Sequence, residues 1–484
     1  MCGIAGVFSR KGADVFDDIA DMLSMMRHRG PEGFGVSTAA GTKKHQSFSH
    51  LNQDKLSGNA GIGHCLLSIT GHDLKPFSGK RFAKNSYGLQ PFSSQTKKIS
   101  LAHNGQIYNY AELTNKKVQS DSEAILHFFE NYPSIEKAIP EFMTLAIGKY
   151  AVAINSGNSL YAFRDVLGIK PLWFGSNTEY SAFASEPIAL KKLNMQFPQP
   201  LLPGHMLKID ENGMETKKIY ALSDFRKTIP KKFSEQRLEQ AFRSSIEHRT
   251  AGLKKTGVFF SGGVDSTLIA VSVAEKIKNT ICFTAGMEGS EDVKFSEKIA
   301  KEAGLKLVVR VIEKDEIPAY ALKTMKSLHF FDAMQLGIGI PEFVAAEAAS
   351  KHGFKVVFSG QGSDEIFAGY SSYKTTLSKQ NHGIVEEEIW AALENLWSRN
   401  LMRDDAVTSA HSLEMRLPFL DLGFLREAMA IPASMKIISK DDKLRKHPIR
   451  NLAKKFKVPF AAIQREKKAM QYGSGVAKEV ERLF

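Results

Sequence analysis

Hydrophobic positions gather in short β-like runs along the first part of the chain, and clusters of Gly, Asn and Ser separate these runs. Such a pattern is typical of an antiparallel, β-rich domain. Helical spacing of apolar residues interrupts it twice, at residues 17–26 and 120–130. The expected strands are residues 3–8, 60–69, 98–103, 145–155 and 159–164.

From about Ser234 the pattern changes to a repeated order of strand, loop and amphipathic helix. Strands that alternate with helices indicate right-handed crossovers and a parallel sheet. The pattern is mostly helical after about Glu386, and the polar, Lys-rich stretch 217–233 is the expected boundary between domains. The expected strand and helix pairs are 257–260 with 265–277, 280–285 with 294–303, 306–311 with 317–327, and 355–359 with 364–370.

Composition narrows the class of protein. A chain of 484 residues with 43% hydrophobic and 24% charged residues is long enough for two or three domains and is not globally disordered. Its three cysteines, Cys2, Cys65 and Cys282, make no disulfide framework. The N-terminus lacks the basic region of a secretory signal, and no apolar run approaches the length of a membrane helix. We expect a cytoplasmic protein that binds no membrane.

The chain is basic, with 65 Lys and Arg against 52 Asp and Glu and a formal charge of +13. Its densest basic stretch, residues 443–457, has apolar positions at helical spacing, which favours a solvated helix face over a binding patch. No arginine-rich arm, zinc-finger spacing or RNA-binding motif accompanies this stretch, so no nucleic-acid partner is expected.

The first chemical signal is Cys2. Once Met1 is removed, its thiolate is a nucleophile beside a free α-amine, whose pKa of about 7.7–8.0 suits a base. A small residue at a chance position is the alternative, and Cys2 alone does not decide between them.

Other segments add to this signal. Residues 27–31 read as a charged turn, and Asn104 with Gly105 can offer a side-chain amide and a backbone N–H to an oxyanion, although Asn-Gly is also a common turn. Asp121 can receive a ligand ammonium group. In this order the segments resemble the N-terminal-cysteine glutaminase domain of class II glutamine amidotransferases. The resemblance implies that Cys2 attacks glutamine through a thioester, that Asn104 and Gly105 form the oxyanion hole, and that Gln106 and Asp121 help to bind glutamine.

The second signal is the segment Ser261-Gly262-Gly263-Val264-Asp265-Ser266, which links an apolar strand to a helix. Its small residues let backbone N–H groups approach phosphate oxygens at a helix N-terminus. It lacks the Walker pattern and resembles the pyrophosphate loop of ATP pyrophosphatases. A bare structural turn is the alternative.

Three later segments extend this second signal. Residues 358–365 follow another apolar strand and end in Ser-Asp-Glu, so Asp265 and Asp364 both lie past strand ends, where a parallel sheet binds ligands. Two aspartates facing a pyrophosphate suit Mg²⁺. Residues 412–421 carry a buried-looking Glu and Arg, and residues 465–475 pair basic residues with glycines, where a lysine can neutralise pyrophosphate or simply form a solvated turn.

Together the motifs resemble glutamine-hydrolysing asparagine synthetases over nearly the whole chain. The resemblance implies an α+β N-terminal glutaminase sandwich of the N-terminal-nucleophile type over 2–217, then an α/β doubly wound ATP-pyrophosphatase domain over 234–484 with a helical C-terminal part. It implies ATP and Mg²⁺, amidation of adenylated aspartate by ammonia from glutamine, release of AMP and pyrophosphate, and a possible homodimer. Carried over residue by residue, Asp265 and Asp364 hold magnesium and Lys467 is catalytic at the pyrophosphate. The implied ATP-binding residues are Phe259, Ser261, Gly262, Gly263, Asp265, Ser266, Ala285, Ser359 and Gly360.

Two positions depart from the family pattern. The family has an arginine that pairs with the glutamine carboxylate where this chain has Leu66, which leaves Arg27, Arg29 or Arg81 as candidate replacements. The family also commonly has a glutamate where Gln361 stands, and an amide cannot take a proton from ammonia. Amidation of another carboxylate, such as a uronic acid or small metabolite, and a decayed amidotransferase that only binds remain the two alternatives.

Overall fold

The computed structural model describes residues 1–51, 55–69, 88–329, 332–466 and 473–483. The chain divides into two compact units, residues 1–225 and 226–484. Among the described residues, none of the helices combines the length and the hydropathy that a membrane crossing requires.

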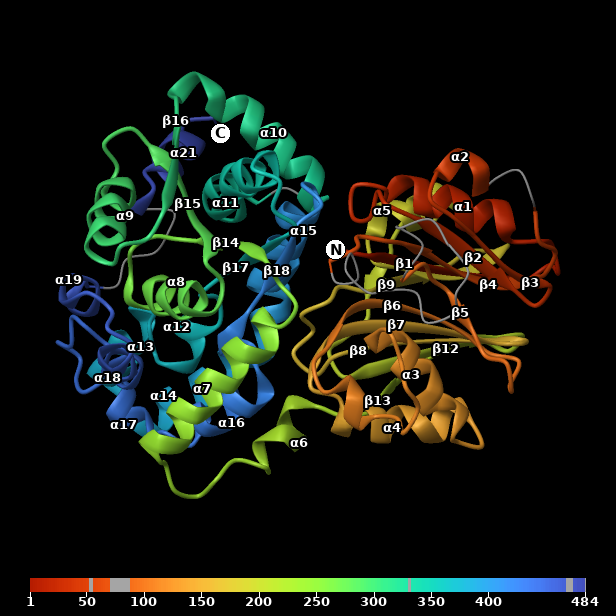
Figure 1. The fold of residues 1–484 in the computed structure, drawn as a ribbon, viewed down its shortest axis with the longest axis horizontal. Helices are drawn as coiled ribbons and strands as arrows, with labels where there is room; N and C mark the ends of the chain where they lie inside the picture. The colour runs from red at the N-terminus through yellow and green to blue at the C-terminus, as the bar shows by residue number, and fades with distance from the viewer. Residues whose placement is uncertain (52–54, 70–87, 330–331, 467–472, 484) are drawn as a thin grey trace. The chain divides into compact units, whose positions relative to one another are not determined.

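The first unit contains two antiparallel sheets between two layers of helices (Figure 1). One sheet has the order β11-β9-β10-β1-β4-β2-β3, and the other has the order β13-β12-β8-β7-β6-β5. Helices α1 (Phe16–Met25) and α5 (Pro187–Lys192) cover the first sheet, and α3 (Asp121–Glu130) and α4 (Ile135–Leu145) cover the second. The first sheet comprises β1 (Gly3–Ser9), β2 (Phe34–Thr38), β3 (Gly41–His45), β4 (Ala60–Cys65), β9 (Trp173–Ser176), β10 (Tyr180–Ala184) and β11 (Gln199–Pro200). The second comprises β5 (Phe92–Ser93), β6 (Ser100–Ile107), β7 (Gly148–Ser156), β8 (Ser159–Arg164), β12 (His205–Asp210) and β13 (Gly213–Lys218).

Alternating side chains of β1 build two of this unit's cores. Ala5 and Val7 pack in the cluster that α1 covers, whereas Ile4 and Phe8 pack in the cluster between the two sheets. Successive residues of a strand point to opposite faces, so one apolar strand serves both layers. The expectation of an α+β sandwich is confirmed.

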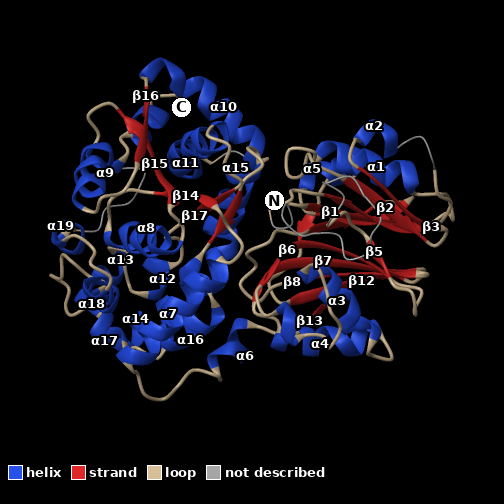
Figure 2. Ribbon diagram, in the orientation of Figure 1, coloured by secondary structure: helices blue, strands red, loops and turns tan. Residues whose placement is uncertain are grey.

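The second unit is built on a parallel sheet of order β16-β15-β14-β17-β18. Helices α8 (Val264–Lys276) and α9 (Glu291–Glu302) lie on one side of the sheet and α11 (Ala333–Lys351) lies on the other, as Figure 2 shows. The order reverses after β16, and right-handed crossovers then place later helices on the opposite face. This arrangement confirms the doubly wound α/β fold. The strands are β14 (Lys255–Phe259), β15 (Asn279–Met287), β16 (Leu307–Ile312), β17 (Val356–Phe358) and β18 (Glu414–Arg416).

Three expected elements differ in length or kind. The strand expected over 60–69 ends at Cys65, because the Leu66 N–H turns to donate to the Gly33 carbonyl, 2.8 Å away. The helix expected over 364–370 is the short α12 (Ser363–Ile366), followed by a turn that brings Gly369 N to Asp364 O, 2.7 Å apart. The C-terminal part is helical as expected but also supplies β18 to the sheet. It contains α15 (Met402–Ser409), α18 (His447–Lys455) and α19 (Phe460–Gln464) among other helices.

Candidate active sites

Cys2 lies immediately before β1, and the first unit holds its backbone firmly. The fully buried guanidinium of Arg29 donates from Nε to the Cys2 carbonyl, 3.0 Å away, and from Nη1 to Glu186, 2.8 Å away. The carboxylate compensates the buried positive charge, so the arginine can serve as a rigid anchor. The Cys2 side chain itself is only partly buried.

The other two thiols differ from Cys2 in their surroundings. Burial raises the pKa of the Cys65 thiol to about 12, and the nearby Cys2 adds to the increase. Burial also raises the pKa of Cys282 to about 12. A thiol with such a pKa is protonated near neutral pH and is a poor nucleophile. Cys2 is therefore the cysteine best placed to react.

Asn104 and Gly105 lie on β6, which packs against β1 and β4. The Asn104 side chain is buried, and neither its amide nitrogen nor its oxygen has a hydrogen-bond partner among the described residues. Gly105 has a φ of +156°, and a Cβ there would lie 2.1 Å from the Lys149 carbonyl oxygen. Only glycine fits this close approach to β7. A buried amide without a partner is costly and is often explained by a ligand.

Asp121 begins α3 and reaches back to the end of β6. Its Oδ2 accepts from the Ile107 N–H at 3.0 Å and lies 3.5 Å from the Gln106 amide nitrogen, and its Oδ1 accepts from the Ser122 N–H at 2.9 Å. These bonds orient the carboxylate beside the strand that carries Asn104 and Gly105. The structure thus brings the four sequence-predicted residues of β6 and α3 together.

The surroundings of Leu66 do not show a replacement for the family arginine. Leu66 is buried. Arg29 is engaged by Glu186, and Arg27 is exposed, with its guanidinium 5.5 Å from the centre of the Phe48 ring. Arg81 lies outside the described residues.

The second unit has a cavity at the carboxyl ends of β14 and β17. The loop 260–263 links β14 to α8, and the loop 359–362 links β17 to α12. Gly262 and Gly263 lie in the first loop but not on the cavity wall. The other predicted ATP and metal residues all line the cavity: Phe259, Ser261, Asp265, Ser266, Ala285, Ser359, Gly360 and Asp364.

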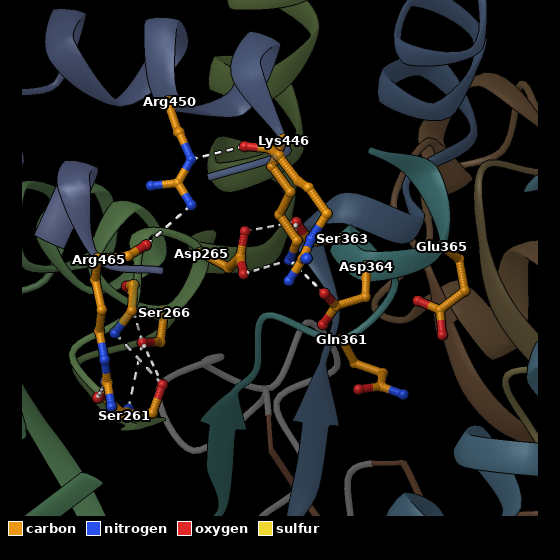
Figure 3. A network of polar contacts seen from close by, with 12 residues as sticks. Ser261, Asp265, Ser266, Gln361, Ser363, Asp364, Glu365, Lys446, Arg450 and Arg465 are labelled. Carbon is orange, nitrogen blue, oxygen red and sulfur yellow. Dashed lines mark hydrogen bonds and ion pairs between the residues drawn. The ribbon is translucent and has the colours of Figure 1, made fainter. Parts of the chain in front are cut away.

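Lys446 joins the two predicted metal ligands (Figure 3). Its buried Nζ lies 2.7 Å from Oδ2 of Asp265 and 2.8 Å from Oδ1 of Asp364. Ser363 donates to the other oxygen of Asp265 at 2.6 Å. One ammonium group thus holds carboxylates from the first turns of α8 and α12 together at the cavity wall.

Gly369 makes room for this arrangement. A Cβ at residue 369 would lie 2.0 Å from Oδ1 of Asp364 and 2.2 Å from Cε of Lys446. No side chain larger than hydrogen fits beside the ion pair.

The expectation that residues 443–457 form a solvated helix face is wrong for the residues at the start of α18. Lys446 and Arg450 are buried, and Arg450 donates to the carbonyls of Arg445 at 2.7 Å and Arg465 at 3.0 Å. The segment is amphipathic, but three of its basic residues, Arg445, Lys446 and Arg450, are buried, and backbone and carboxylate oxygens accept from Lys446 and Arg450. Sequence spacing could not show this, since the acceptors come from distant segments.

Arg465 supports the phosphate-loop region. Its Nη1 donates to the Ser261 carbonyl at 2.6 Å, and its Nη2 lies 2.7 Å from Oδ1 of Asp292 on α9 (Figure 3). The basic segment singled out from sequence therefore contacts the loop through its first residue. Lys467, the predicted catalytic lysine, lies outside the described residues.

The Glu and Arg expected to be buried in 412–421 are confirmed as such. Arg416 Nε donates to Glu414 at 2.9 Å, and both side chains are almost fully buried on β18. In the same segment, Asp421 accepts from Arg249 at 2.6 Å, which helps lower the pKa of Asp421 below its ordinary value against the effect of burial. The Glu414–Arg416 and Asp421–Arg249 pairs lie on or near β18 and do not line the cavity.

Comparisons with known proteins agree with this organisation. The family model described as "Asparagine synthase" matches residues 237–386 and 378–483, and the model "Glutamine amidotransferase domain" matches residues 80–192. A putative glutamine-hydrolysing asparagine synthetase 1 of Methanocaldococcus jannaschii is 31% identical over 99% of this chain and 95% of its own length. Asparagine synthetase 2 of Oryza sativa subsp. japonica is 28% identical over 98% of this chain and 78% of its own length. A probable asparagine synthetase of Acanthamoeba polyphaga mimivirus is 29% identical over 79% of this chain and 73% of its own length.

The fold and the matches define an amidotransferase in which a glutamine amidotransferase domain precedes a parallel-sheet ligase domain. The chain belongs to the asparagine synthase family. Members of this family are glutamine-hydrolysing, ATP-dependent ligases.

Proposed function

We propose that the protein is a glutamine-hydrolysing asparagine synthase, which uses ATP to amidate the β-carboxylate of aspartate and releases AMP and pyrophosphate. The glutaminase domain would span residues 2–217 and the synthetase domain residues 234–484. The proposal rests on the cavity in which segments 261–266 and 359–364 meet and in which Asp265 and Asp364 face one ammonium group. Family membership and the names of the relatives support aspartate as the acceptor.

In the glutaminase half, Cys2 is the proposed nucleophile after removal of Met1. Its free α-amine, with a pKa of about 7.7–8.0, would take the thiol proton. The thiolate would attack the glutamine carboxamide, ammonia would leave, and water would hydrolyse the thioester. The unpartnered Asn104 amide and the Gly105 N–H would stabilise the oxyanion, and Gln106 and Asp121 would bind glutamine.

In the synthetase half, ATP is the proposed co-substrate at the cavity wall named above. The acceptor carboxylate would attack the α-phosphorus, pyrophosphate would leave, and ammonia would then displace AMP. Gly262 and Gly263 would offer backbone N–H groups to phosphate oxygens at the start of α8. Lys446 and Lys467 would compensate the charge of the departing pyrophosphate.

The residues present fit Mg²⁺. Magnesium is usually held by one or two carboxylates together with phosphate and water oxygens. Asp265 and Asp364 supply two carboxylates on the same cavity wall, and the described residues hold no cluster of three or more metal-ligating side chains that would suit another metal better. These aspartates would hold Mg²⁺, and the ion would neutralise charge on the ATP phosphates.

We also propose a cytoplasmic location and a small-molecule chemistry without nucleic-acid or membrane partners. All three cysteines are free, which suits a reducing compartment. We further propose a homodimer, which a measurement of the molecular mass in solution would test.

The proposal is tested by substrate-dependent pyrophosphate release with ammonia as nitrogen donor. Aspartate should give the highest kcat/KM in a panel that includes glutamate, uronic acids and other small carboxylates. Asp265→Asn and Asp364→Asn should each abolish release. A uronic acid as the best substrate would replace aspartate as acceptor, and no release with any carboxylate would favour a decayed, binding-only protein.

A further inference from the structure

The far wall of the synthetase cavity carries two acidic residues that the proposed function leaves unused. Glu342 of α11 and Asp404 of α15 both line the cavity, and both side chains are more than nine-tenths buried. Gln361 lines the same cavity. Sequence motifs gave no sign of these acids, because they lie on two helices far apart in the chain.

The two carboxyl groups lie at the same guanidinium group, that of Arg403. Neighbouring carboxylates repel each other when both are ionised, so one proton held by the pair relieves the repulsion. Burial, and then the charge of Asp404, raise the pKa of Glu342 well above its ordinary value. Burial also raises the pKa of Asp404 despite the opposing charge of Arg403.

The positive charge beside the pair does not neutralise both acidic groups. Arg403 Nη2 lies 2.6 Å from Asp404 Oδ1, and its Nε lies 3.6 Å from Glu342 Oε2, so one cation faces two acids. Gln335 of α11 accepts from Arg403 at 3.0 Å without adding charge. Asp405 and Tyr370 act on the cluster electrostatically, Asp405 by raising the pKa of Asp404 and Tyr370 by raising that of Arg403.

The other acidic residues of the cavity wall form ion pairs with different cations. Asp265 and Asp364 face the ammonium of Lys446, and Asp292 faces Arg465. Among the described lining residues, Glu342 and Asp404 form a carboxyl pair in which burial raises the pKa of both members. Amide synthesis at this site needs a proton acceptor, and the amide of Gln361 cannot serve as one.

We propose that the Glu342–Asp404 pair is the proton acceptor for the attacking ammonia, in the role that Gln361 cannot fill. This inference rests on the proposed function. Ammonia forms a bond to the carbonyl carbon of the acyl-adenylate, and the bond from that carbon to the phosphate oxygen breaks. AMP leaves with the bonding electron pair, and the nitrogen loses one proton to the singly ionised pair, which returns it to solvent in the next cycle.

The test separates adenylation from amide formation in the full-length protein with ammonia as nitrogen donor. Asp404→Asn and Glu342→Gln should each lower the kcat of amide formation by about 100-fold or more, the usual contribution of a general base. Acceptor-dependent exchange of labelled pyrophosphate into ATP should stay near the wild-type rate, because no ammonia takes part in it. The remaining amide formation should also lose the lower inflection of the wild-type pH profile, measured at constant free ammonia.

A second residue on the same helix gives a matched control. Glu347 of α11 pairs with Lys351 at 2.9 Å and does not line the cavity, so Glu347→Gln should leave both reactions unchanged. A rescue variant adds a readout that a purely structural role would not move. Gln361→Glu in the Asp404→Asn background should restore amide formation at least tenfold.

Three outcomes overturn the inference: full amide formation in both single variants, a parallel loss of exchange and amide formation in both, or no rescue by Gln361→Glu. Wild-type protein that shows no acceptor-dependent exchange would instead contradict the proposed function, so the two failures are distinguishable.

Discussion

The ammonium nitrogen of Lys446 lies 2.7 Å from a carboxylate oxygen of Asp265, although 181 residues separate the two in the chain. Asp265 lies in the first turn of α8 and Lys446 precedes α18, so the contact joins the start of α8 to the helical C-terminal part. Lys446 also lies 2.8 Å from Asp364, and the ion pairs tie three segments into one wall.

Removal of this cation should weaken both stability and adenylation. Lys446→Met leaves two carboxylates facing each other without compensation, and loss of one partner of a buried pair costs about 3–5 kcal/mol. We expect a lower free energy of unfolding in urea and loss of pyrophosphate release. Lys454→Met, at an exposed lysine of the following helix α18, is the control and should change neither quantity. A fully active Lys446→Met enzyme would refute the role.

Gly369→Ala should disturb the same ion pair by steric overlap. The added methyl group would overlap Oδ1 of Asp364 and Cε of Lys446, so one of them must move. We expect pyrophosphate release to fall at least tenfold, which corresponds to about 1.4 kcal/mol. Gly175→Ala in the first unit tests whether any glycine substitution has this effect, since residue 175 has no positive φ and its Cβ would come no closer than 3.2 Å to another residue, at the Met195 sulfur. Equal losses in the two variants would contradict the steric account.

Alkylation should select Cys2. Because the pKa values of Cys65 and Cys282 are raised to about 12, their thiolate fractions are negligible near pH 8 and rise only in strong alkali. Iodoacetamide at pH 8 should therefore modify Cys2 first and abolish glutamine-dependent synthesis, while ammonia-dependent synthesis persists. Peptide mass mapping locates the adduct, and Cys2→Ala should reproduce the split. Modification of Cys65 at the same rate would show that the thiol assignment is wrong.

Asn104→Ala should separate activity from stability. The buried amide has no hydrogen-bond partner among the described residues, so its loss should cost little stability, but it should lower glutaminase kcat by about 100- to 1000-fold as an oxyanion donor. Asn109→Ala is a comparison variant in which hydrogen bonds are lost, because Asn109 donates to the Leu145 carbonyl at 3.0 Å and accepts from the Ile147 N–H at 2.8 Å. It should lower the melting temperature with little effect on kcat. The reverse result would remove Asn104 from the oxyanion hole.

Leu66→Arg should be a gain-of-function variant. A charge-assisted hydrogen bond contributes about 1.5–3 kcal/mol, so a new pair with the glutamine carboxylate should lower KM by about 10- to 150-fold. Ammonia-dependent synthesis should not change. If the wild-type KM is already low micromolar and the variant is worse, another group binds the carboxylate, and substitution of Arg27, Arg29 and Arg81 in turn should identify it.

The sequence predicts those parts of the fold that local patterns determine. Short apolar runs located β1 and β8, and helical spacing after Ser120 located α3, where Ser120 caps the helix by accepting from the Glu123 N–H. The end of β4 and the shortness of α12 were not predictable, because contacts with distant segments determine where each element stops.

The same distinction holds for the candidate sites. Cys2, Asn104 and the two glycine-rich loops have local signatures, and the structure places the loops on one cavity. Lys446 looked like part of a solvated helix, and Glu342 and Asp404 belong to no motif. Their roles depend on which side chains meet across helices, and single-sequence periodicity does not contain that information.

Transfer of nitrogen from glutamine tests the central claim most directly. Purified protein is incubated with Mg-ATP, aspartate labelled with ¹⁸O in its β-carboxylate, and glutamine labelled with ¹⁵N in its amide, and the products are analysed by mass spectrometry. The account predicts asparagine with ¹⁵N in its carboxamide, one ¹⁸O in AMP and an equal amount of pyrophosphate. Unlabelled AMP, ADP in place of AMP, or glutamine hydrolysis without labelled asparagine would contradict it.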